Sequence, residues 1–119
     1  MADFGGEMVL TLSGGTAITM RGELSVMPTG TSNEPITNQN GSVSRSATLT
    51  PRKAECTFED GGQDWEALMR LRFNATFRED FTAVSHFFTD AFFEGEPTIN
   101  RKTGEVSGLS IVTDAYRRV

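Results

Sequence analysis

The chain has 119 residues and a formal net charge of −5, and 37% of its residues are hydrophobic. This length suits one domain spanning residues 1–119, and the hydrophobic content is too high for a disordered chain. The acidic balance argues against a protein that grips nucleic acid, because neutralising phosphates requires a basic surface.

The first residues show neither a secretion signal nor a membrane anchor, since no basic segment is followed by an apolar one and no apolar run approaches 20 residues. We therefore expect synthesis in the cytoplasm. Residues 8–12 are apolar enough for a strand, and residues 13–15 read as a turn. Residues 16–27 alternate, with Ile18, Met20, Leu24 and Val26 on one face, which predicts a half-buried strand paired with the first.

Residues 28–42 are predicted to be a long polar loop. They include two Pro, two Gly and three Asn, and Ile36 is the one aliphatic residue. Such a segment buries too little apolar surface to fold alone, and long loops in compact domains are usually functional or disordered. A partner-binding loop and a surface loop without a partner are both open at this point.

Residues 43–60 predict a strand that is interrupted at Pro51. The apolar positions before the proline are odd-numbered and those after it are even-numbered, which indicates a bulge or break. Val43, Ala47 and Leu49 are expected on one buried face, and Ala54, Cys56 and Phe58 on the next. Cys56, the single cysteine, is interpreted as a buried reduced thiol, with a bridge between subunits as the alternative.

One short helix is predicted over about 64–72. Asp64 suits its N-cap, Glu66 complements the start of the helix dipole, and Arg70 and Arg72 complement the end. The apolar stripe, with Trp65 at its head, predicts packing on a sheet. A strand over 74–79 follows, and the turn residues 101–104 predict a hairpin between the flanking strands.

The stretch "HFFTDAFF", residues 86–93, places a large ring on each side of a strand twice over. Strict alternation puts Phe88 and Phe92 on one face and Phe87 and Phe93 on the other, whereas a bulge at Thr89 to Ala91 would exchange the faces. In either case one pair is expected in the core, and alternation alone leaves open what covers the other pair.

No catalytic motif is visible in the sequence. His86 is the single histidine, and alternation turns Ser85 to the opposite face, so a Ser-His-Asp triad with Asp90 fails on geometry. Cys56 and His86 show no metal-ligand spacing, and no glycine pattern suits a phosphate. We therefore expect no enzyme activity, no cofactor and no metal, and a packed or interface role for His86.

The order of these features resembles the tail tube proteins of contractile bacteriophages and related tail-like particles. The likeness is greatest over residues 51–111. There "TFED" followed by "DWEALMRL" resembles the middle section of the family, and "DAFFEGEP" followed by "GEVSGLSI" resembles its C-terminal hairpin.

The resemblance implies a mainly β (α+β) fold, a compact β-sandwich or barrel of antiparallel strands with a flanking helix. It also implies hexameric rings that stack into the inner tube of a virion tail, through which DNA passes without specific binding. Tail sheath, baseplate and tail-terminator proteins would be partners, and assembly would take place in the host cytoplasm. Both a phage tail and a phage-derived injection particle fit this resemblance.

Three sets of site residues follow as expectations. The long loop would contact neighbouring subunits, and the Phe-rich strand would share its rings between core and ring interface. Acidic residues would line the lumen, with an outer or inter-ring position as the alternative. The loop set is Pro28, Asn33, Pro35, Ile36 and Asn38; the aromatic set is Phe87, Phe88, Phe92 and Phe93; the lumen set is Glu23, Glu55 and Glu59. The alternative function is a small ligand-binding β-barrel whose pocket the four phenylalanines line.

Overall fold

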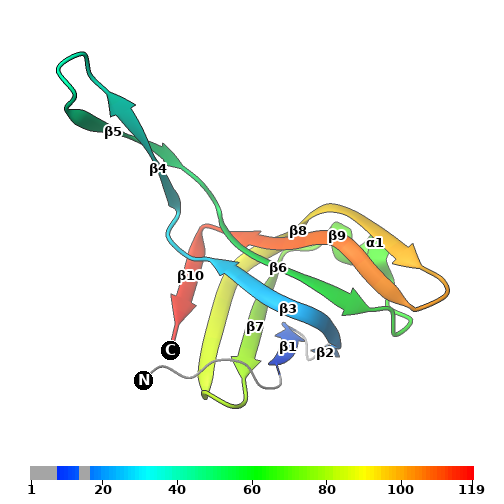
Figure 1. Ribbon diagram of the computed structural model, residues 1–119. Helices are drawn as coiled ribbons and strands as arrows, with labels where there is room; N and C mark the ends of the chain where they lie inside the picture. The colour runs from blue at the N-terminus through cyan, green and yellow to red at the C-terminus, as the bar shows by residue number, and fades with distance from the viewer. Residues whose placement is uncertain (1–7, 14–16) are drawn as a thin grey trace.

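The computed structural model describes residues 8–13 and 17–119 and shows a mainly β protein with one short helix (Figure 1). This confirms the predicted fold class, and the sheets are antiparallel throughout. The turn expected over 13–15 lies largely outside the described residues. The elements are β1 (Met8–Leu12), β2 (Ala17–Ile18), β3 (Met20–Met27), β4 (Thr31–Thr37), β5 (Val43–Leu49), β6 (Arg52–Glu59), α1 (Trp65–Met69), β7 (Phe73–Glu79), β8 (Val84–Asn100), β9 (Glu105–Thr113) and β10 (Ala115–Arg118).

Strand β8 joins the two layers of the body. The strand order is β2-β1-β7-β8-β9-β6-β3, with β10 also pairing with β8. The first half of this 17-residue strand pairs with β7 and β10, and its second half pairs with β9. Because β2 and β3 each pair on one side within the described residues, the body is an open sandwich and not the closed barrel that the sequence analysis allowed.

The predicted N-terminal hairpin is confirmed, but its second strand divides at Thr19. β2 pairs with β1, whereas β3 crosses to the other layer and pairs with β6. The predicted inward face holds across the break: Ile18 is buried, and Met20, Leu24 and Val26 pack against the core. The same alternating sequence thus presents an inward apolar face in both layers, because alternation of side chains along a strand does not depend on the pairing partner.

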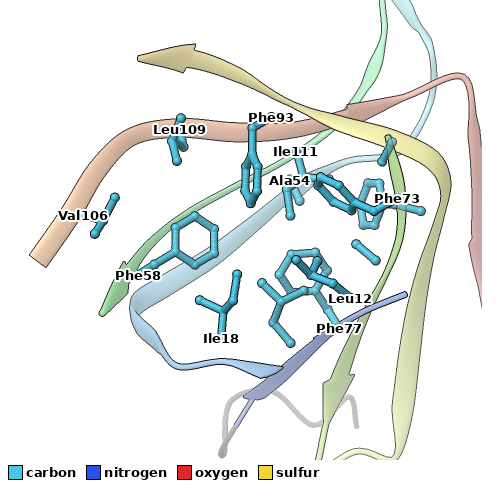
Figure 2. Packing of buried hydrophobic residues seen from close by; sticks show 14 of the residues in the cluster. Leu12, Ile18, Ala54, Phe58, Phe73, Phe77, Phe93, Val106, Leu109 and Ile111 are labelled. Atoms are coloured by element: carbon cyan, nitrogen blue, oxygen red, sulfur yellow. The ribbon is translucent and has the colours of Figure 1, made fainter. Parts of the chain in front are cut away.

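Aromatic rings from both layers meet in the centre of the core (Figure 2). Phe93 lies 5.9 Å from Phe58, 5.0 Å from Phe73 and 6.2 Å from Trp65, measured between ring centroids. Each buried aromatic side chain contributes roughly 1.5–3 kcal/mol through the hydrophobic effect. The helix therefore packs on the sheet through Trp65, as predicted.

The helix is shorter than predicted, Trp65–Met69 instead of about 64–72. Asp64 is the N-cap, since its carboxylate accepts a bond from the backbone nitrogen of Ala67 at 3.2 Å. The helix ends at Met69, with Arg70 as its C-cap, and the chain becomes extended in β7 from Phe73. Neither Arg70, the C-cap residue, nor Arg72 lies in the last turn, so they do not complement the dipole as expected.

Two C-terminal features complete the body. The hairpin over 101–104 is confirmed, with β8 and β9 paired beside it. The tail forms β10 on the edge of β8, a strand that the sequence analysis did not predict because four residues carry little periodicity. No helix of the described residues is long and apolar enough to cross a membrane.

Candidate assembly surfaces

The predicted polar loop at 28–42 is in fact the first half of a β-hairpin. β4 and β5 pair in register from Thr31 with Leu49 to Thr37 with Val43, and we call this hairpin, residues 31–49, the arm. Every residue of both strands is exposed, and the arm projects away from the sandwich (Figure 1). The loop prediction was wrong because pairing satisfies backbone groups without any apolar content.

Side-chain hydrogen bonds organise the tip of the arm. The Asn38 amide donates to the hydroxyls of Ser42 at 3.0 Å and Ser44 at 3.1 Å, and Asn40 accepts from the Ser42 backbone. At the root, the Thr50 backbone nitrogen donates to the Gly30 carbonyl at 3.0 Å. An isolated two-stranded hairpin is marginally stable in water, so a partner surface would stabilise the arm.

The two faces of the arm differ in polarity. Val43, Ala47 and Leu49 do share one face, as alternation predicted, but the described part of the chain leaves this face uncovered: Val43 is 67% and Leu49 89% exposed. The expectation that they are buried was therefore wrong. Ile36 lies on the opposite face and is 48% exposed. The β5 side chains were not predicted as surface candidates because an apolar alternation normally indicates a core.

The structure places the five predicted loop residues along the arm and its root. Pro28 lies just before the arm, Asn33, Pro35 and Ile36 lie in β4, and Asn38 lies at the tip. The backbones of Asn38 and Ser42 form a hydrogen-bonded pair, and along an antiparallel hairpin such pairs alternate with non-hydrogen-bonded ones. Pro35 is an odd number of residues from Asn38, so it occupies a non-hydrogen-bonded position and the Pro35 nitrogen points away from β5. Proline is tolerated in a strand at such an outer edge, where it also blocks pairing by a further strand.

A bulge in β8 exchanges the faces of the Phe-rich stretch. Asp90 has a φ of 53°, and the pairing of β7 with β8 shifts register opposite it. Phe88 and Phe93 are consequently both in the core, with exposures of 1% and 3%. The strict alternation that grouped Phe92 with Phe88 is wrong, and the exchange of faces by a bulge is confirmed.

Each outward ring of this stretch lies under an arginine. The Arg72 guanidinium is 5.1 Å from the centre of the Phe92 ring, and that of Arg117 is 5.2 Å from Phe87. Phe92 remains 37% exposed. Cation–π contacts at exposed sites contribute about 0.5–1 kcal/mol, so these rings are held in place while still offering apolar surface.

Glutamates gather on the outer face of the layer formed by β3, β6, β9 and the second half of β8. The three predicted residues, Glu23, Glu55 and Glu59, alternate with inward side chains and lie on this face. Glu94 and Glu105 join them, because Ser110 pairs with both Glu55 and Glu94, and Glu59 pairs directly with Glu105.

Cations on this face are fewer. Lys53 lies 3.5 Å from Glu94, and Arg21 lies 3.3 Å from Glu59. We call this surface the acidic face. Its two additional glutamates were missed because strand register, and not sequence spacing, brings them beside the others.

His86 serves the structure. It is 7% exposed, its Nδ1 lies 2.7 Å from the Tyr116 hydroxyl, and its Nε2 donates to the Glu79 carboxylate. These contacts join β7, β8 and β10, and burial raises the pKa of Tyr116. Asp90 is exposed and pairs with Arg72 at 3.4 Å, so it does not form a triad with His86.

Cys56 is a free, half-buried thiol whose pKa is raised to about 12 by desolvation. We expect iodoacetamide at pH 8 to label the folded protein far more slowly than the urea-unfolded protein. Since only the folded state disfavours the thiolate, the free energy of unfolding should fall as pH rises from about 9 toward about 12. Equal labelling rates for the two states would contradict this placement of the thiol.

The described residues hold no cluster of three or more His, Cys, Asp or Glu side chains that could bind a metal ion. The pocket of the alternative function is also not formed by the four phenylalanines. Phe88 and Phe93 pack against other rings in the core, while Phe87 and Phe92 point outward.

Three solved structures share the fold at low sequence identity. Hcp1 from Flavobacterium johnsoniae superposes with a TM-score of 0.62 at 14% identity, covering 93% of both chains. A chain of the PVC sheath-tube complex, an extracellular contractile injection system in the extended state, gives 0.57 at 8%, covering 94% of this chain and 87% of that one. The tube-terminating cap of the anti-feeding prophage gives 0.57 at 9%, covering 100% and 93%. A search of curated sequences found no significant match.

The fold is thus an open sandwich with a projecting arm whose apolar side chains are exposed. The family model for the phage tail tube protein matches residues 1–110, and the chain therefore belongs to the phage tail tube protein family.

Proposed function

We propose that this chain assembles into hexameric rings that stack into the inner tube of a phage tail, the conduit for genome delivery. The observation that carries the proposal is the arm, whose strands are exposed on both faces in the isolated chain. Family membership supports it, as does the fold shared with chains of tube complexes. The role is structural, without catalysis or a cofactor.

The arm supplies the contacts between subunits. Its two faces carry different side chains, with Val43, Ala47 and Leu49 on one and Ile36 on the other. A stacked ring needs a lateral contact within the ring and an axial contact to the next, and two distinct faces suit two distinct contacts. The predicted residues Pro28, Asn33 and Asn38 lie at the root, middle and tip of this surface.

The acidic face lines the lumen. Repeated around a ring, Glu23, Glu55 and Glu59 with Glu94 and Glu105 would create a negative potential over the whole channel wall. Such a wall repels phosphates, so DNA passes without binding. At physiological salt the repulsion decays over about 8 Å from the wall, so it acts on DNA that comes close to the wall.

The opposite outer face, on the layer of β1, β7, β8 and β10, faces away from the lumen. It presents Arg78, Arg117 and the half-exposed Phe87, and so differs in charge from the acidic face. This is the side available to a sheath. Tail sheath, baseplate and terminator proteins are the proposed partners of the tube, which is assembled in the host cytoplasm and carried in the virion.

Replacing residues 31–49 by Asn-Gly tests the role of the arm. Because Gly30 and Thr50 form a hydrogen-bonded pair, a two-residue turn can close the gap without strain. We expect a folded monomer with an unfolding midpoint close to that of the full chain, since the arm contributes no buried side chain. Negative-stain electron microscopy should show rings or tubes for the full chain and none for the variant.

A matched control replaces only Asn40 and Gly41 at the tip with a different turn sequence of equal length. It should keep the strands of the arm and retain assembly. A full chain that remains monomeric at high concentration, or an arm-less variant that still forms tubes, would overturn the proposed function as stated.

A further inference from the structure

We propose that the Val43–Arg45–Ala47 face of the arm docks on a second copy of this chain, in a depression beside Phe92. Arg45 would lie against the carboxylate of Asp114. The inference rests on the proposed function and identifies the surface that receives the arm.

The receiving surface is a depression at the root of the arm, formed where β8, β9 and the segment before β6 meet. We call it the Phe92 depression. Phe92, Val112 and Pro51 provide apolar surface there. The remaining lining residues are polar or charged: Arg72, Asp90, Thr113 and Asp114.

Some charged side chains around the Phe92 depression form ion pairs and others do not. Arg72 covers the Phe92 ring and pairs with Asp90 at 3.4 Å. Arg52 donates to the backbone carbonyl of Asp114 at 2.9 Å, so its guanidinium lies beside this residue without bonding the carboxylate. Across residues 8–13 and 17–119, the Asp114 side chain has no ion pair. The depression therefore offers apolar surface next to one carboxylate that forms no ion pair within the described residues.

The arm offers the complementary surface. Arg45 and Glu34 are its two charged residues, and they lie on opposite faces. Arg45 lies between Val43 and Ala47 on the apolar face, and it too has no ion pair within the described part of the chain. An apolar face with a single arginine matches an apolar depression with one carboxylate that forms no ion pair.

The arm of the same chain cannot fill this depression. Pro51, which lines the depression, lies at the root of the arm, and the arm leads away from the body (Figure 1). Val43 is six residues from Leu49 toward the tip, which places it about 20 Å from Leu49 at the usual strand rise. The occupant is therefore another copy. Because the two surfaces differ, the contact is head-to-tail, which generates rings or helical filaments.

Charge exchange tests this contact. Arg45→Glu and Asp114→Arg should each raise the protein concentration needed for tube formation at least about tenfold, since like charges would then face each other. The double variant should return that concentration to within about threefold of the original, because the pair is restored in reverse. Sedimentation of the full chain over a concentration series, with electron microscopy of the pellet, measures both.

The control is Glu34→Arg, which changes the charge of the other arm face. Combining it with Asp114→Arg should not restore the protein concentration needed for tube formation. Circular dichroism and thermal melting should match the original chain for all variants, because these side chains are exposed. Single variants that assemble normally, or a double variant no better than the worse single one, overturn the docking proposal and leave the tube function standing. Absence of assembly in the original chain overturns both.

Discussion

Truncating Phe88 to alanine is expected to lower the free energy of unfolding by about 3–5 kcal/mol, a large part of the stability of a domain of this size. The ring is 1% exposed and packs 5.6 Å from Phe77 and 5.0 Å from Tyr116, between centroids. Its removal leaves a cavity and also loosens the support for β10, which Tyr116 anchors. Urea denaturation followed by fluorescence or circular dichroism measures the loss.

The matched variant is Phe92→Ala, four residues further along the same strand. Phe92 is 37% exposed and lies on the outer face, so its truncation should cost about 1 kcal/mol or less. It should nevertheless impair tube formation, because it removes the apolar surface that we propose receives the arm. Two variants equally destabilised would show that both rings are ordinary core, contrary to the bulge at Asp90.

Alanine at Gly95 or Gly108 is expected to be the most damaging change outside the aromatic core. A Cβ on Gly95 would lie 2.2 Å from the Gly108 carbonyl oxygen, and one on Gly108 would lie 2.6 Å from the Glu96 carbonyl oxygen. Both glycines have positive φ, 101° and 83°. Since the opposing atoms belong to the backbone of a paired strand, relief requires separating β8 from β9, at about 3 kcal/mol or more.

Gly41→Ala provides the control for this prediction. Gly41 also has a positive φ, 84°, but its added Cβ would meet nothing within 4 Å. It should cost only the backbone strain, about 1 kcal/mol. Chemical denaturation of the three variants separates the free-energy cost of backbone strain from that of the steric clash between β8 and β9. A Gly95→Ala variant no less stable than Gly41→Ala would refute the tight β8–β9 contact.

Part of this fold is readable in the sequence because it depends on near neighbours. The alternation of Ile18, Met20, Leu24 and Val26 identifies an inward face, and Asp64 marks the start of the helix. The turn at 101–104 identifies the last hairpin. The order of these elements also supported the resemblance to tail tube proteins, which the family match confirms.

The candidate assembly surfaces were less accessible to sequence reasoning. Residues 28–42 read as a loop because they lack apolar residues, yet a hairpin is stabilised by backbone pairing and makes no such demand. Val43 and Leu49 read as core because alternation reports only that two side chains share a face. It cannot report whether that face is covered by the same chain.

By itself, the sequence determined the strand-rich class, the inward faces, the break at Pro51 and the family resemblance, since each follows from local periodicity, turn chemistry or motif order. The tertiary structure alone decided the exchange of Phe92 and Phe93 at the Asp90 bulge and the gathering of Glu55, Glu94 and Glu105 on one face. The physical reason is register: one inserted residue reverses every side chain that follows, and pairing between distant strands sets which side chains become neighbours.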